Sequence, residues 1–238
     1  MENDTSQHYL VCEHKFIFAL LMMTSGMMGA YTFNIRGGVF CNAQTANIVI
    51  MSIAFGKGEF LRALYFLIPI SAYLLGTIIS ELMPFHIKKI GLLRWDTCFI
   101  IYEMFILFLI GFMPLAWPHQ IVQVIINFTA SMQYNTFRQA EGIPMATTFC
   151  TNHVRQVGIS CARIIRKRDH YALKKGLVHI EMLLAFFIGG ACLTYLCHVL
   201  SIRAIWLALI PLGIALYQMV KADLTFEHEL LQNKPHGH

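Results

Sequence analysis

A polar motif occurs twice in this chain, each time between strongly apolar stretches. The first copy reads Gln44-Thr45-Ala46-Asn47 and the second reads Cys150-Thr151-Asn152-His153. The central threonines, Thr45 and Thr151, lie 106 residues apart, so the chain has the pattern of two halves built on one plan. Hydroxyl and amide groups at such positions can hydrogen-bond a small polar solute. Duplicated halves with polar interruptions in apolar segments are typical of the binding sites of secondary transporters.

Each copy of the motif is predicted to start a short helix inside the membrane. Segment 43–56 would rise only about 21 Å as a helix, which is less than the roughly 30 Å hydrocarbon core. Segment 147–162 is too polar to face lipid. We therefore expect two re-entrant half-helices whose N-termini lie deepest, where unpaired N–H groups favour an anion or a neutral polar solute. The predicted solute-binding residues are Gln44, Thr45, Asn47, Gln133, Asn135, Thr151, Asn152, His153 and Arg155.

A purely structural role is the alternative for these side chains. Threonine and asparagine cap helix ends, and hydrogen bonds between membrane helices contribute only about 0.6 kcal/mol on average. Glu103, in the middle of an apolar stretch, leaves two interpretations open. It is either a proton-coupling site or a protonated carboxyl bonded to a neighbouring helix. Arg36 and Arg138 lie near the points where the two re-entrant segments enter the membrane, and are candidates for vestibule charges.

The composition places the chain in the membrane class. Of its 238 residues, 57% are hydrophobic and only 13% are charged, against about 25% charged in an average soluble domain. The formal charge of +5 comes from basic residues in short loops between apolar stretches. That pattern is typical of cytoplasmic loops of membrane proteins. We therefore expect the lipid bilayer as a partner, and no nucleic acid.

The positions of lysine and arginine predict the topology. If 43–56 and 147–162 dip into the membrane and return, the basic loops 88–94 and 163–175 lie on the same side as both termini. That side is then cytoplasmic, and each half reads span, re-entrant helix, span, span, in opposite orientations. The predicted fold is an all-α integral membrane protein with six transmembrane helices plus two re-entrant half-helices in two inverted-topology repeats. The predicted spans are roughly 16–33, 60–83, 95–117, 119–137, 177–198 and 202–220.

The same topology divides the chain into four parts. A cytoplasmic N-terminal segment covers 1–14, the first membrane repeat 15–117, the second 118–221, and a cytoplasmic C-terminal tail 222–238. The seven cysteines form no C-x-x-C pair, and most lie in apolar stretches, which favours buried free thiols over a disulfide framework. Cys150 with His153 is the single local candidate for a nucleophile and base. We predict no metal, no cofactor and no catalytic residue.

At the two motifs the chain resembles the YoaK family of bacterial membrane proteins, a domain of unknown function. The family's first motif is a Gly-Gly-x-Phe run ending in Gln-Thr-Gly-Asn, and it stands here as residues 37–47. The second resembles 133–137 followed by 146–151. The similarity covers about residues 15 to 220. It differs where both Thr-Gly-Asn triplets are altered, to Thr45-Ala46-Asn47 and Thr151-Asn152-His153. The resemblance implies a multi-pass protein of the bacterial inner (cytoplasmic) membrane.

The leading hypothesis is a small transporter or channel-like permease for a small polar or anionic solute, bound between the two half-helix N-termini. A non-transporting receptor, sensor or accessory subunit is the alternative, in which the basic loop 163–175 binds anionic lipid or a partner. A membrane-embedded enzyme ranks third. A homodimer is also considered, because 238 residues is small for a transporter.

Overall fold

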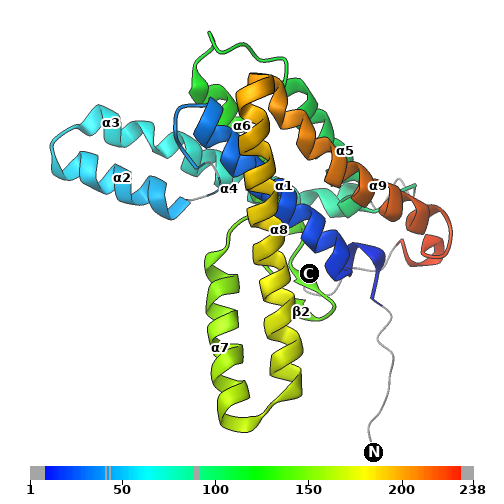
Figure 1. Ribbon diagram of the computed structural model, residues 1–238. Coiled ribbons are helices and arrows are strands. Elements are labelled where there is room, and N and C mark those ends of the chain that lie inside the picture. The colour runs from blue at the N-terminus through cyan, green and yellow to red at the C-terminus, as the bar shows by residue number, and fades with distance from the viewer. Residues whose placement is uncertain (1–8, 41, 43, 88–91, 232–238) are drawn as a thin grey trace, which may run out of the picture.

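The protein is almost entirely helical (Figure 1). The computed structural model describes residues 9–40, 42, 44–87 and 92–231, without the side chains of 85–87. Within these ranges the only sheet is a two-stranded hairpin. The helices are α1 (Lys15–Ile35), α2 (Gln44–Gly56), α3 (Phe60–Tyr65), α4 (Leu67–Ile87), α5 (Trp95–Ile110), α6 (His119–Thr136), α7 (Thr151–Lys167), α8 (His170–Leu200) and α9 (Leu209–Leu224). Short elements are the 3-10 helices η1 (Val11–Glu13), η2 (Ser201–Ala208) and η3 (His228–Leu230) and the strands β1 (Gln139–Ala140) and β2 (Ile143–Pro144).

Three helical segments in the described ranges are long and apolar enough to cross a membrane: Lys15–Ile35, Phe60–Pro84 and His170–Leu224. The all-α prediction is thereby confirmed, and the apolar helices are compatible with a membrane protein. The 55-residue segment contains two of the predicted spans, 177–198 and 202–220, and η2 begins between them at Ser201. α5 has only 16 residues, and α6 carries many polar side chains, so neither meets the same test of length and composition.

Two helix pairs form the body of the protein: α1 packs on α8, and α6 packs on α4. Glycines bring both pairs close. A Cβ added at Gly26 of α1 would lie 2.0 Å from the Phe186 carbonyl oxygen, and one at Gly189 of α8 would lie 2.1 Å from that of Met23. In the second pair, a Cβ at Gly76 would lie 2.6 Å from the Phe128 carbonyl oxygen. Only the absence of a side chain permits such approaches between membrane helices.

Two helical hairpins project from this body (Figure 1). The first, α2 with α3, exposes large apolar side chains such as Phe55 and Leu61. The second, α7 with the beginning of α8, is polar and basic. Its cations are Arg155, Arg163, Arg166, Lys167, Arg168, Lys174 and Lys175. The two projecting hairpins therefore present different surfaces, one apolar and the other basic.

A buried ionic network ties the two ends of the chain to the start of α5. The Arg94 guanidinium lies 3.6 Å from an Asp223 oxygen of α9 and 3.7 Å from a Glu227 oxygen. The Thr97 hydroxyl donates to Asp223 at 2.6 Å, and the Val11 N–H donates to Glu227 at 2.7 Å. Glu227 and Asp223 are almost fully buried. The segment before α1, the start of α5 and the segment after α9 therefore lie together.

The β1–β2 hairpin was not predicted from the sequence. Its turn holds Glu141 at φ 47° and Gly142 at φ 76°, and two positive φ values are what a two-residue type I′ turn requires. The Glu141 N–H donates to the Glu13 carbonyl oxygen at 2.9 Å. The hairpin therefore attaches the connection between α6 and α7 to the chain just before α1.

Replacing Gly189 by Ala tests the close contact of α1 and α8. The new methyl group would collide with the Met23 backbone, so we expect destabilisation of about 1–3 kcal/mol. The matched control is Gly158→Ala in α7, where nothing lies within 4 Å of the added Cβ, and this variant should be neutral or slightly stabilising. Chemical unfolding in detergent compares the two. Equal stabilities would contradict the close approach.

Replacing Glu227 by Gln tests the buried network. Burial raises the pKa of the Glu227 carboxyl above 4.5, the value before folding. The folded protein then binds this proton more tightly than the unfolded chain does, so its stability falls as the pH rises from 4.5 towards the folded pKa. Glu227→Gln removes this fall and keeps an acceptor for Val11.

The measurement is the melting temperature in detergent between about pH 5 and pH 7.5. The wild type should lose more stability over this interval than Glu227→Gln, because the other titrating groups are common to both proteins. Parallel curves would contradict the assignment.

Candidate functional site: the junction of the two broken segments

The two polar motifs meet in the structure. The Nδ2 of Asn42, just before α2, donates to the carbonyl oxygen of Thr148, just before α7, at 2.6 Å. These residues are 106 positions apart, the same offset that separates Thr45 from Thr151. Two positions with the same spacing as the two motif threonines are therefore in direct contact. We call residues 36–40, 42 and 137–150, with the first turns of α2 and α7, the junction; Cys41 and Ala43 lie outside the described residues.

The first motif binds to the middle of α6. The Gln44 Nε2 donates to the Asn127 Oδ1 at 2.6 Å, and the buried Asn47 donates to the Gln44 Oε1 at 3.3 Å. Asn127 in turn donates to the Pro69 carbonyl oxygen of α4 at 2.6 Å. Thr45 faces outward and is exposed. Of the three predicted residues in this motif, Gln44 and Asn47 share one polar chain and Thr45 stands apart.

Gln133 lies at the centre of the protein and is fully buried. Its amide nitrogen donates to the Ser25 hydroxyl of α1 at 3.1 Å and lies 3.5 Å from the Thr147 carbonyl oxygen. The hydroxyls of Thr147 and Thr148 are buried and have no hydrogen-bond partner among the described residues. An unpaired buried hydroxyl is costly, so this part of the junction holds polar groups that the described side chains leave unsatisfied.

The second motif borders a cavity of about 360 Å³. The predicted residues Asn135 and Asn152 both line it, together with Arg138. Asn135 donates to the Ser80 hydroxyl at 2.9 Å, and Arg138 pairs with Glu81 of α4. Arg138, predicted as a vestibule charge, therefore does stand at a cavity. Thr151 and Arg155 are exposed on the first turns of α7, and the Arg155 guanidinium donates to the Asn152 Oδ1 at 3.1 Å.

A second cavity, of about 310 Å³, lies at the other end of α6. Asn47, Asn127 and Gln123 line it, and so do Gly37 and His119. No Asp, Glu, Lys or Arg is among the described residues that line it. The Nδ1 of His119 is buried without a hydrogen-bond partner in the described structure. This cavity therefore offers amide and imidazole groups and no fixed charge of either sign.

Arg36, the other predicted vestibule charge, is fully buried instead. Its guanidinium donates to the Tyr31 hydroxyl at 3.2 Å and to the carbonyl oxygens of Met113 and of Pro114, the latter at 3.1 Å. These two carbonyls lie just past the C-terminus of α5, where the helix dipole is negative and free acceptors remain. Arg36 therefore closes the end of α5, and the vestibule interpretation is wrong for it.

His153 points into the protein and pairs with a histidine that the sequence did not single out. Its Nε2 donates to the Ala146 carbonyl oxygen at 2.7 Å, and its Nδ1 lies 3.0 Å from the Nδ1 of His179 on α8. Both rings are fully buried. Because the carbonyl requires a proton on the His153 Nε2, the neutral pair places the shared proton on the His179 Nδ1. Both nitrogens of His153 are thus occupied, which leaves neither to act as a base for Cys150.

Glu103 is fully buried in α5, and neither carboxyl oxygen has a hydrogen-bond partner among the described residues. Ionising such a group without a partner is costly. It does not belong to either cavity lining, so its predicted proton-coupling role stays a prediction. No group of three His, Cys, Asp or Glu side chains suited to a metal ion occurs in the described part of the chain.

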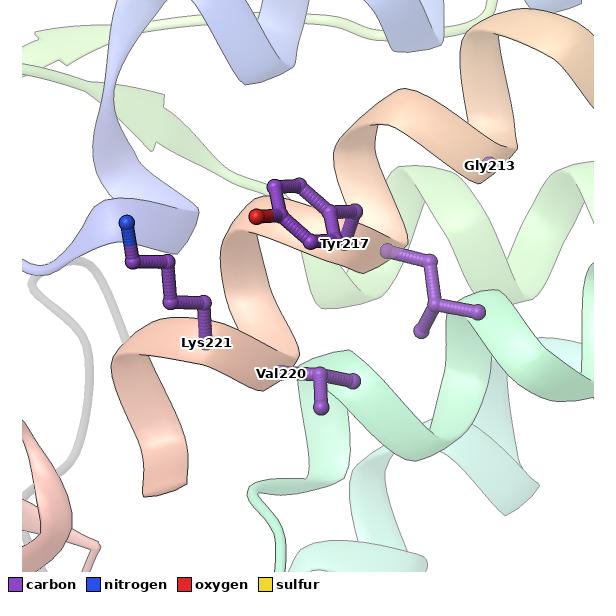
Figure 2. A pocket seen from close by; sticks show the side chains of 5 residues that line it. Gly213, Tyr217, Val220 and Lys221 are labelled. Carbon is purple, nitrogen blue, oxygen red and sulfur yellow. The ribbon is translucent and has the colours of Figure 1, made fainter. Parts of the chain in front are cut away.

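A groove on α9 is a third hollow in the surface (Figure 2). It measures about 370 Å³ and is lined by residues of this one helix, including Gly213, Tyr217 and Lys221. Figure 2 shows the Tyr217 and Lys221 side chains along its edge. None of its lining residues comes from the junction, so it is not part of the candidate site.

Several residues of α6, α4 and α8 that contact the predicted site residues or line a cavity were not predicted from the sequence. Asn127 and Gln123 line a cavity, Ser131 packs against Gly76, and His179 pairs with His153. A signal was present for the α6 residues, because polar side chains recur there at every fourth position, which places them along one side of a helix. No comparable signal marks His179, whose role depends on how α7 and α8 pack.

Replacing Gln133 by Leu tests the centre of the junction. The change leaves the Ser25 hydroxyl and the Thr147 carbonyl without their amide donor, so we expect a loss of about 1–3 kcal/mol in stability. Gln120→Leu on the exposed part of the same helix is the matched control and should cost little. In a double-mutant cycle with Ser25→Ala, the two changes should not be additive; additive effects would show that the pair does not interact.

The chain belongs to the family described as "Protein of unknown function (DUF1275)", whose model matches residues 17–218. The match runs from α1 into α9 and includes both broken segments. The YoaK proteins, which the motifs resemble, are members of this family. No curated protein and no solved structure matches the chain.

Proposed function

We propose that this DUF1275 protein is a small permease of the cytoplasmic membrane, which moves a small polar solute through the junction. The observation that carries the proposal is the contact between Asn42 and Thr148 at corresponding positions of the two halves. Asn47 of the first motif lines one cavity and Asn152 of the second motif lines another, and the Thr148 hydroxyl beside the contact has no hydrogen-bond partner among the described residues. A scaffold protein would have no need for such a polar, incompletely satisfied centre.

The packing supports two inverted repeats, with α1, α2, α3–α4 and α5 corresponding to α6, α7, α8 and α9. Under this correspondence the α1–α8 interface maps onto the α6–α4 interface, and both are observed. The α2–α3 and α7–α8 hairpins map onto each other in the same way. α5 and α9 correspond to each other and pack together, as do Asn42 and Thr148. Contacts between an element and its own counterpart in the other repeat are expected along a two-fold axis.

The ionic network supports the proposed orientation. Arg94 joins the segment before α1, the start of α5 and the segment after α9, so these three points share one side of the membrane. Six spans, formed by α1, α4, α5, α6, α8 and α9, satisfy this requirement. The basic α7–α8 hairpin then lies on the same side, which the positive-inside rule makes cytoplasmic. The exposed apolar surface of α2, α3 and α4 faces lipid or a second copy of the chain.

This topology places the two cavities on opposite sides of the junction. The 310 Å³ cavity lies beside the start of α6 and the 360 Å³ cavity beside its end. From Asn127 to Asn135 the helix rises about 12 Å, which is less than half the thickness of the hydrocarbon core. Two facing vestibules separated by a short closed region are the arrangement expected of a permease.

A non-transporting sensor or accessory subunit is the second candidate. The observation that favours it is the projecting α7–α8 hairpin, which carries six of the eleven exposed lysines and arginines of the described residues and could bind anionic lipid headgroups or an acidic partner. This candidate requires no flux through the junction, so a transport measurement separates the two.

The test is uptake of labelled solutes into liposomes that contain the purified protein. A panel of small anions, neutral polar metabolites and cations is compared for the wild type and for the double variant Asn47→Ala/Asn152→Ala, which removes one amide from each cavity. We expect uptake of one class of solute, reduced about tenfold or more in the variant because two hydrogen bonds are lost. Asn34→Ala, at the exposed end of α1, is the matched control and should transport normally.

Two outcomes would contradict the proposal. Absence of uptake for every solute in a folded, correctly inserted protein would favour the sensor. Uptake that is unchanged in the double variant would show that the solute does not pass the junction.

A further inference from the structure

A continuous polar stripe follows α6 where this helix faces α4. Gln123, Asn127, Ser131 and Asn135 recur at every fourth position, which places them along one side of the helix. Asn127 donates to the Pro69 carbonyl oxygen at 2.6 Å, and Asn135 donates to the Ser80 hydroxyl at 2.9 Å. We call this α4–α6 interface, from Gln123 to Asn135, the polar seam.

The polar seam joins the two cavities. Gln123 and Asn127 line the 310 Å³ cavity at one end, and Asn135 lines the 360 Å³ cavity at the other. Midway between them the seam is closed, because Gly76 of α4 lies directly against Ser131. A Cβ built on Gly76 would be 2.0 Å from the Ser131 Oγ. The closed part of the seam therefore lies between Asn127 and Asn135, about 12 Å along α6, and a movement of α4 away from α6 would connect the cavities.

The α1–α8 interface, which corresponds to the polar seam, carries mostly apolar side chains at the equivalent positions of α1. Thr32, near the end of α1, and Thr136, at the end of α6, are 104 positions apart, and this offset aligns the two helices. At the positions of Asn127, Ser131 and Asn135, α1 carries Met23, Met27 and Tyr31. The α1–α8 interface is closed by direct backbone contact at Gly26 and Gly189. α8 is also held along its length by α1 and α7, whereas much of α4 is exposed. Of the two equivalent interfaces, the polar seam is thus the one that can hydrate and open.

The seam carries no net charge. From Gln123 to Asn135 its polar groups are amides and a hydroxyl, and the charges at its inner end, Glu81 and Arg138, pair with each other and bond to Asn135. A lone ion passing Ser131 would leave water without meeting an opposite charge, which is costly at membrane depth. Amides and hydroxyls can instead replace the hydrogen bonds that a neutral solute makes with water.

We infer that the polar seam between α4 and α6 is the path of the solute, and that it admits small neutral polar molecules in preference to ions. This inference rests on the proposed permease function and narrows its solute class. Among the small polar solutes of the proposed permease, anions are then less favoured than neutral molecules, although Arg138 and Arg155 lie near the inner end of the seam.

The test is the reactivity of single cysteines in membrane vesicles. In a background with all seven native cysteines replaced, cysteine is placed at Asn127, Ser131 or Asn135, with Met27→Cys as the matched control on α1. Gln123→Cys is a second outer position in case Asn127→Cys fails to fold. The probes are a small neutral methanethiosulfonate and its anionic and cationic analogues, applied from either face of the membrane.

We expect Asn127→Cys to react from the outer face and Asn135→Cys from the inner face. Ser131→Cys should react with the neutral probe, at least tenfold faster than with either charged analogue, while Met27→Cys stays protected. Reaction of Asn127→Cys and Asn135→Cys from the same face would overturn the path. So would equal protection of Ser131→Cys and Met27→Cys. Equal reaction of Ser131→Cys with all three probes would overturn the preference for neutral solutes.

Labelling does not depend on finding a transported solute. A protected seam in a protein that transports would place the path elsewhere and leave the proposed function intact. A labelled seam in a protein that transports nothing would count against the permease and therefore against the seam as a path.

Discussion

A chain that interrupts its helices within a membrane must satisfy the free backbone groups from inside the protein, because lipid offers them no partner. In this structure polar side chains meet that requirement by donating to backbone carbonyls. Asn42 donates to Thr148, His153 to Ala146, and Gln123 to Arg36. Each donor comes from an element remote in sequence from its acceptor or from the opposite side of a break. The junction therefore joins the chain before α2 to the chain before α7.

The same requirement explains why the α1–α8 pair and the α4–α6 pair differ. In the α1–α8 pair, glycines allow the backbones to touch, and few polar groups are needed at the contact. In the α4–α6 pair, Asn127 must reach both Gln44 of the first broken segment and Pro69 of α4. The second arrangement is more polar and lies between two cavities. One of the two helix pairs is therefore a close backbone contact, and the other is a polar interface between two cavities.

Much of this architecture could be predicted from the sequence. The two breaks, their polar helix starts and the all-α fold followed from the spacing of apolar stretches and from the repeated motif. The partners could not be predicted, because His179, Ser80 and Pro69 contact the site only through the packing of whole helices. Thr45 and Thr151 recur at matching positions, yet both are exposed, while the neighbouring Asn47 and Asn152 line the cavities. The spacing of the motif in the sequence does not show which side of each helix turn faces inward.

Arg36 and the β1–β2 hairpin show two further limits of sequence reasoning. An arginine beside a glycine pair has the pattern of an exposed loop charge, but the carbonyls of Met113 and Pro114 provide a buried site for it. The hairpin strands have two residues each, too few for an alternating pattern to be recognised.

The central claim is that a small polar solute binds at the junction, and binding to the purified protein tests it most directly. The measurement is thermal stabilisation in detergent against neutral polar metabolites, anions and cations, for the wild type and for Asn47→Ala/Asn152→Ala. A solute at 100 times its dissociation constant should add about 2.7 kcal/mol to the stability if it binds only the folded protein. The account predicts stabilisation of the wild type by neutral polar solutes and its loss in the double variant. Stabilisation by no solute, or an equal effect in both proteins, would contradict it.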